Sequence, residues 1–219
     1  MQEAQGLTDC RLATVAPGGA SYGYASYWTE KFGLKCELVV AQSYDIIAAG
    51  VRSGTYTLGV IPRSTVGTVP AGVNVIIPQN TPDYPGFPDG RQVVIAGLLG
   101  LRANVDGKRE DLVRFERAMI EAQREMAAAS PDDLVRDVQQ VEIFKAIPVE
   151  TLRKQVITAA SNIWKDPETG KAGFISEATW VKSLRTYGYW GLQGFRPDDP
   201  AIAYDRMVDM SFFRAAEKQ

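Results

Sequence analysis

Short apolar runs alternate with polar turns and helix-compatible segments in the first quarter of the chain. Strand-forming residues dominate 10–16, 35–41 and 56–61, and polar turns at 17–22 and 42–45 follow the first two runs. The pattern predicts a strand–helix–strand–helix–strand unit. Strands that alternate with helices are typical of a parallel sheet in an α/β fold, and such sheets bind ligands at the carboxyl ends of their strands.

The sequence in the middle of the chain predicts two further strands of the sheet. Residues 73–77 indicate another strand, and the unbroken apolar run 93–101 indicates a strand that is buried on both faces. Between them, 78–91 holds four prolines and two glycines, which neither a helix nor a central strand tolerates. We therefore expect a sheet lobe over 1–108, with a proline-rich loop, and a helical portion over 109–219 that packs on the sheet.

From residue 109 onward the apolar spacing is helical. One stripe of apolar residues recurs at intervals of three and four, at Leu112, Phe115, Met119, Ala122 and Met126.

Ser130 and Pro131, followed by two aspartates, indicate a second helix start. We expect a third helix along 152–163, a fourth that Ser176 caps, and a short terminal helix within 204–216. Asp166 opens a turn-rich break whose acids lack the spacing of a calcium loop.

Composition narrows the classes of function. The chain has 219 residues and a net charge of −2, and its lysines and arginines form no basic run, so we expect no nucleic-acid partner. No apolar run approaches the roughly 20 residues that span a bilayer. Histidine is absent, which excludes Ser-His and Cys-His nucleophile pairs and His-ligated metals. The absence of histidine therefore argues against an enzyme, with carboxylate or cysteine chemistry as the open alternative, and we expect no cofactor and no metal.

The two cysteines stand at the starts of two predicted strands. If the strands holding Cys10 and Cys36 are neighbours, about 4.8 Å separates them, which is within reach of a disulfide. A disulfide indicates an oxidising compartment, whereas two buried free thiols are the alternative. The polar N-terminus, without a signal-like apolar segment, fits a mature end with an added methionine, and a cytoplasmic start would look the same.

The chain resembles the periplasmic substrate-binding proteins of the sulfonate, nitrate, taurine and thiamine-precursor uptake group. The residues that carry this diffuse resemblance are 16–21, 32–34, 46–54, 55–60, 93–103, 110–115, 130–133, 180–188 and 211–213. It implies a periplasmic-binding-protein-like sheet, a periplasmic location and delivery of a ligand to the permease of an ABC-type importer. These proteins usually close two lobes on a ligand, and this sequence has one clear βαβαβ unit.

In that family, ligand oxygens meet helix N-termini at the strand ends, where free N–H groups and the helix dipole favour an anion. We therefore expect a small organic anion, such as an aromatic carboxylate or a sulfonate, with Arg63 as its bidentate partner. The predicted ligand-binding residues are Gly18, Gly19, Ser21, Tyr22, Ser43, Tyr44, Arg63 and Ser64.

Plainer interpretations stay open for these residues. Gly18 and Gly19 also suit a simple tight turn, Arg63 a solvated loop, and Asp45 a helix N-terminal acid. The aromatic residues of 22–28 suit either a ligand wall or a core that holds Trp28 with tyrosines at the surface.

The alternative function is a single-lobe relative that docks onto another protein subunit, or onto a second copy of the chain, without a ligand. On this hypothesis the partner supplies the wall that faces the sheet lobe.

Overall fold

The computed structural model of the chain divides into two compact units. Unit 1 consists of Met1–Arg91 and Leu184–Pro197, and unit 2 of Gln92–Ser183 and Asp198–Gln219. The structure describes residues 6–62, 72–74, 93–94, 96–161, 163–189 and 195–218. The predicted loop 78–91 and most of the predicted strand 73–77 lie outside these residues.

Unit 1 is built on a parallel sheet, which among the described residues has three strands. They are β1 (Cys10–Thr14), β2 (Cys36–Val40) and β3 (Leu58–Gly59), in the spatial order β2-β1-β3. Leu12 of the central strand lies opposite Leu38 on one side and Leu58 on the other. The predicted α/β class, with a parallel sheet flanked by helices, is confirmed.

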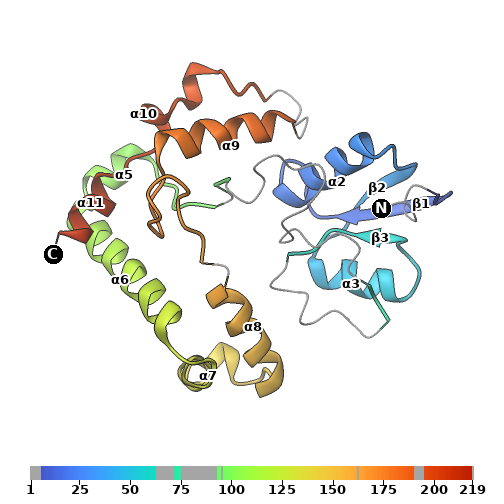
Figure 1. The fold of residues 1–219 in the computed structure, drawn as a ribbon, viewed down its shortest axis with the longest axis horizontal. Coiled ribbons are helices and arrows are strands. Elements are labelled where there is room, and N and C mark those ends of the chain that lie inside the picture. The colour runs from blue at the N-terminus through green and yellow to red at the C-terminus, as the bar shows by residue number, and fades with distance from the viewer. Residues whose placement is uncertain are drawn as a thin grey trace. The chain divides into compact units, whose positions relative to one another are not determined.

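Helices α2 (Ala20–Lys31) and α3 (Tyr44–Arg52) lie on opposite faces of this sheet (Figure 1). The chain moves one way from β1 to β2 and then back past β1 to β3, and right-handed crossovers in opposite directions place their helices on opposite faces. Leu12 shares a buried cluster with Trp28 of α2, and Ala13 shares one with Ile47 of α3. Successive residues of β1 therefore supply two core layers.

The predicted disulfide between Cys10 and Cys36 is confirmed. The two residues are partners in the parallel register of β1 and β2, with 4.3 Å between their Cα atoms. Among the described residues no cysteine is free. The bond therefore fastens the amino ends of two strands that are already paired along their length.

Two glycines let α3 pack closely on the segment that follows it. A Cβ atom at Gly59 would overlap the side chain of Ile47, and one at Gly50 would overlap the ring of Tyr56. Because interiors are close-packed, neither position has room for a larger residue without a shift of the helix.

The predicted buried strand at 93–101 is wrong for its described residues. Val93 is buried, but the segment from residue 96 to residue 100 has no regular structure, and Leu98 and Leu99 are 71% and 87% exposed. The Val94 N–H donates to the Ser183 hydroxyl at 2.9 Å. A continuous apolar run does not by itself specify a strand, because its burial depends on which segments cover it.

Unit 2 is helical in its described residues. Its elements are α5 (Arg102–Asp106), α6 (Arg109–Ala128), α7 (Pro131–Gln139), η1 (Glu142–Phe144), α8 (Val149–Ser161), most of α9 (Glu177–Tyr189), η2 (Pro200–Ile202), α10 (Tyr204–Met207) and α11 (Ser211–Glu217). The predicted terminal helix is in fact two short helices, α10 and α11.

Helix α6 buries a different face from the predicted one. Val113 and Ile120 form a buried cluster with Phe213 of α11. Phe115 and Met119, which belong to the predicted stripe, are 47% and 42% exposed. The covering helix comes from the far end of the chain, so local periodicity could not indicate which of two adjoining apolar faces it would cover.

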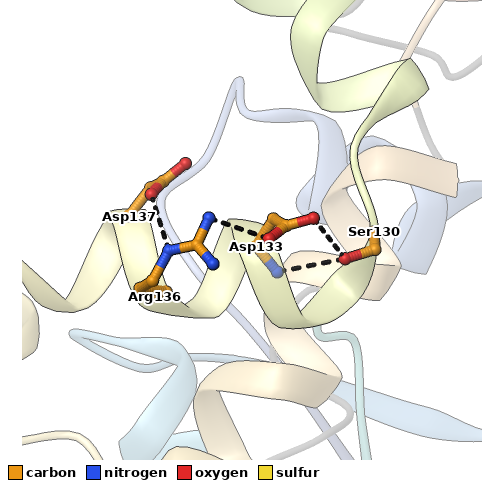
Figure 2. Close-up of polar contacts among 4 residues, drawn as sticks. All are labelled: Ser130, Asp133, Arg136 and Asp137. Atoms are coloured by element: carbon orange, nitrogen blue, oxygen red, sulfur yellow. Dashed lines mark hydrogen bonds and ion pairs between the residues drawn. The ribbon is translucent and has the colours of Figure 1, made fainter.

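The predicted start of α7 is confirmed, and Figure 2 shows its polar contacts. The backbone N–H of Asp133 donates to Ser130 Oγ at 3.2 Å, and the Ser130 hydroxyl donates to Asp133 Oδ2 at 2.6 Å. Arg136 forms ion pairs with Asp133 at 2.8 Å and Asp137 at 3.6 Å. The hydrogen bonds from Ser130 and Arg136 lower the pKa of Asp133.

The break at Asp166 is a tightly bonded turn around a fully buried carboxylate. Its Oδ1 accepts from the Glu168 N–H at 3.1 Å and from the Thr169 N–H at 2.9 Å. Its Oδ2 accepts from the Ser176 N–H at 2.8 Å and from the Ser176 hydroxyl at 2.9 Å. Burial raises the pKa of Asp166, but these hydrogen bonds outweigh it and hold the pKa at about 2.

The same serine begins α9, as predicted. The Thr179 N–H donates to Ser176 Oγ at 3.2 Å, and the Ser176 hydroxyl is also within 2.9 Å of Thr179 Oγ1. The Asp166 turn and the helix start are therefore one hydrogen-bonded structure.

Candidate functional site

The carboxyl end of β1 is where the chain reverses direction across the sheet. From β1 the chain passes to β2 on one side, and β3 then returns to the other side. In open α/β sheets, ligands bind outside the carboxyl ends of the strands at such a reversal. The predicted residues Gly18, Gly19, Ser21 and Tyr22 follow this strand end directly.

The N-terminus of α2 has no side-chain cap. Its N-cap residue is Gly19, and Gly18 before it has φ +85°, a left-handed conformation that glycine adopts easily. The Gly19 N–H donates to the Ala16 carbonyl at 3.2 Å, and the helical hydrogen bonds begin with the Gly23 N–H, which donates to the Gly19 carbonyl at 3.0 Å. Helix geometry therefore leaves the N–H groups of 20–22 without intrahelical acceptors, at the positive end of a 12-residue helix.

Two buried hydroxyl groups belong to these elements, one at the end of β1 and one in the first turn of α2. Thr14, the last residue of β1, is fully buried, and Ser21 is 7% exposed. Neither Thr14 Oγ1 nor Ser21 Oγ has a hydrogen-bond partner. Sequence reasoning did not single out Thr14, although a hydroxyl residue that ends an apolar central strand was a signal for it.

The start of α3 is built differently. Ser43 is its N-cap, and Ser43 Oγ accepts from the Ile46 N–H at 3.3 Å. Asp45 lies in the first turn, as expected for a helix N-terminal acid. Tyr44 is half-buried against the cluster that contains Ile47. The α3 start is therefore capped by its own side chains.

The two predicted turns share one edge of the sheet but not one face. The turn at 17–22 leads into α2 and the turn at 42–45 into α3, and these helices cover opposite faces. The structure thus brings together Gly18, Gly19, Ser21 and Tyr22, with Ser43 and Tyr44 on the other face. Arg63 and Ser64 lie outside the described residues and stay predictions.

Two aromatic side chains of α2 belong to the core. Tyr24 and Trp28 are 5% and 7% exposed, and their ring centroids lie 5.7 Å apart in a stacked arrangement. Tyr187 packs against the same cluster, and burial, together with Tyr24, raises its pKa to about 12. The surface position expected for the tyrosines is wrong for Tyr24, and half-buried Tyr22 is the aromatic residue next to the open helix start.

Hydrogen-bond donors make up the chemistry of this site. Backbone N–H groups and hydroxyls can hold an anion, and in the described residues both cysteines are bonded to each other. Within those residues no group of three Cys, Asp or Glu side chains is placed to hold a metal ion. The donors gathered at the α2 start suit the binding of an anion.

An open hollow lies at the opposite end of the strands. Its volume is about 560 Å³, and it is lined by Thr8, Asp9, Cys10, Arg11, Lys35 and Glu37. The hollow is shallow and its charges are of both signs, so they do not favour an anion. We place the candidate site at the α2 start, where uncapped donors and unpartnered hydroxyls occur together.

No described helix is both long and apolar enough to cross a membrane. In comparisons with known proteins, no family model matches the chain, and no curated protein or solved structure matches it.

Proposed function

We propose that this chain binds a small organic anion, such as an aromatic carboxylate or a sulfonate, without transforming it. The observation that carries the proposal is the uncapped start of α2 at the carboxyl end of the central strand. Free N–H groups and the helix dipole attract an anion there, and no side chain of the N-cap competes for them.

We also propose the physiological setting that the family resemblance implies. The protein acts in the periplasm and delivers its ligand to the permease of an ABC-type importer, within a periplasmic-binding-protein-like fold. The disulfide between Cys10 and Cys36 supports this compartment, because such bonds persist in oxidising surroundings. Arg63 and Ser64, which follow the third strand in the sequence, are the proposed additional ligand contacts.

Thermal unfolding with added anions tests this proposal. We expect benzoate or benzenesulfonate, but not chloride at equal ionic strength, to raise the midpoint by several degrees, since a ligand at a hundred times its Kd contributes about 2.7 kcal/mol. Arg63→Ala should abolish the shift. Arg52→Ala, which removes an exposed charge from the last turn of α3, is the matched control and should retain it. Absence of any anion effect on the wild-type protein would contradict the proposal.

One observation favours a second candidate function, docking onto another protein subunit or a second copy. Leu98, Leu99 and Leu101 are 71%, 87% and 74% exposed in one short segment, an unusual concentration of apolar surface. Light scattering after size-exclusion chromatography separates the candidates. A monomer that binds anions supports the first, and a multimer that Leu99→Ser converts to monomers supports the second.

A further inference from the structure

The hydroxyls of Thr14 and Ser21 are among the few buried polar side-chain groups of the described residues that have no hydrogen-bond partner. Unpartnered hydroxyls in an interior cost free energy, and native proteins leave few of them. By contrast, the Ser183 hydroxyl, also fully buried, donates to the Thr179 carbonyl at 2.7 Å and accepts from the Val94 N–H at 2.9 Å. Arg117 Nε, Gln123 Oε1 and Trp164 Nε1 of unit 2 also lack a partner, but their residues are only partly buried.

Both hydroxyls lie at the same end of the same core layer. Thr14 shares a sheet face with Leu12, two residues before it, and α2 covers that face. Ser21 shares the buried face of α2 with Ala25 and Trp28, four and seven residues later. A helix between parallel strands runs antiparallel to them, so its first turn lies at the carboxyl end of β1.

We infer that Thr14 and Ser21 are ligand-binding residues whose hydroxyls donate hydrogen bonds to an oxygen of the bound anion. This inference rests on the proposed function and specifies the ligand's chemistry. An oxyanion presents several acceptor oxygens, so one can meet the N–H groups of 20–22 while another meets the two hydroxyls. A halide has a single centre and cannot serve both sets of donors.

The present conformation covers both hydroxyl oxygens with protein. A ligand oxygen can therefore reach them only after the chain that surrounds them moves. In the ligand-free protein the two unpartnered hydroxyls lower the free energy of unfolding. Hydrogen bonds to the ligand would restore that free energy. Binding sites commonly contain polar groups that lack a partner until the ligand binds, and these groups lower the stability of the ligand-free protein.

Paired measurements of stability and affinity test the inference, in the wild type, Thr14→Val, Ser21→Ala and Thr57→Val. Thr57 is the matched control, because it directly precedes β3 and its exposed hydroxyl accepts from the Arg11 N–H at 3.1 Å. The probes are benzoate and methanesulfonate, with chloride at equal ionic strength. Thermal midpoints without ligand report stability, and calorimetric titration reports affinity.

We expect opposite changes in the two quantities at the site. Thr14→Val should raise the ligand-free midpoint by about 2–4 °C, because it replaces an unpartnered buried hydroxyl with a methyl group of similar size. It should also weaken oxyanion binding about tenfold, and Ser21→Ala should weaken it similarly. Thr57→Val should keep the wild-type affinity and gain no stability.

Two results would overturn the inference while leaving the proposed function intact. One is wild-type affinity in Thr14→Val and Ser21→Ala. The other is a lower ligand-free midpoint in Thr14→Val, which would show that the hydroxyl is bonded structurally, for example to an internal water. If neither probe binds the wild-type protein, the proposed function fails and this inference fails with it.

Discussion

In unit 2 the buried carboxylate of Asp166 accepts hydrogen bonds on both of its oxygens, whereas in unit 1 the buried hydroxyls of Thr14 and Ser21 have no partner. The two kinds of group are equally hidden from solvent. A buried polar group with hydrogen-bond partners stabilises the fold, whereas a buried polar group without a partner destabilises it. Burial alone therefore does not identify a functional residue, but burial without a partner does suggest one.

The same contrast appears at the helix starts. Ser130 and Ser176 each cap a helix of unit 2 with a side-chain oxygen, whereas Gly19 caps α2 without one. Within unit 1, Ser43 caps α3 in the ordinary way. Helices α5, α6, α10 and α11 also begin without a side-chain cap, so the missing cap alone does not distinguish the α2 start. What distinguishes it is that two buried, unpartnered hydroxyls adjoin it.

Asp166→Asn should have the largest effect on stability. An amide cannot accept on both sides, so at least two hydrogen bonds to a buried charge are lost, at a cost of about 4 kcal/mol. Native-state hydrogen exchange should show reduced protection in α9 and unchanged protection in β1. Asp132→Asn, at an exposed position, is the control. Unchanged exchange in α9 would contradict a structural role for Asp166.

The pH dependence of unit 2 follows from the same carboxylate. The pKa of Asp166 is about 2 in the folded protein and 3.8 for a free side chain, so its stabilising contribution is complete above about pH 4. That contribution is lost as pH falls from 4 toward 2, because the unfolded state takes up the proton first. Between pH 4 and pH 2 the free energy of unfolding should fall more steeply for the wild type than for Asp166→Asn. Equal slopes for the two proteins would refute the role of Asp166 in this pH dependence.

Removal of the disulfide should have the next largest effect, and it should fall on the other unit. The bond closes a loop with a sequence separation of 26, and constraint of such a loop contributes about 3 kcal/mol. Cys10→Ser/Cys36→Ser should therefore lose protection in β1 and β2 but not in α6. A loss of protection in α6 as well would show that the two units unfold together and are not independently stabilised.

Ser130→Ala should have the smallest effect, about 1 kcal/mol, because it removes one capping oxygen at an exposed helix start. Chemical denaturation that is monitored in unit 2 can measure this change. Ser161→Ala, at the last residue of α8, is the control, because its hydroxyl donates only to the Thr158 carbonyl at the helix end. Equal effects of the two substitutions would show that the Ser130 cap contributes nothing specific.

Local patterns in the sequence were sufficient for much of unit 1. The strand–helix alternation predicted the parallel sheet, and the positions of Cys10 and Cys36 predicted the disulfide, because both depend on neighbours in one short segment. The Ser130 helix start was predicted for the same reason.

Features that depend on distant segments were not predictable. The buried face of α6 is decided by Phe213, almost a hundred residues later. The described residues of the run at 93–101 pair with none of the described strands. Thr14 was missed because its significance lies in a missing partner, which only three-dimensional packing reveals.

The most direct test of the account is a titration of the isotopically labelled protein with benzoate, followed through backbone amide NMR signals. The account predicts saturable shifts that are largest for Ala20, Ser21 and Tyr22, whose N–H groups would meet the anion. Shifts confined to the hollow near Lys35, or to the capped start of α3, would contradict it. So would the absence of any saturable shift.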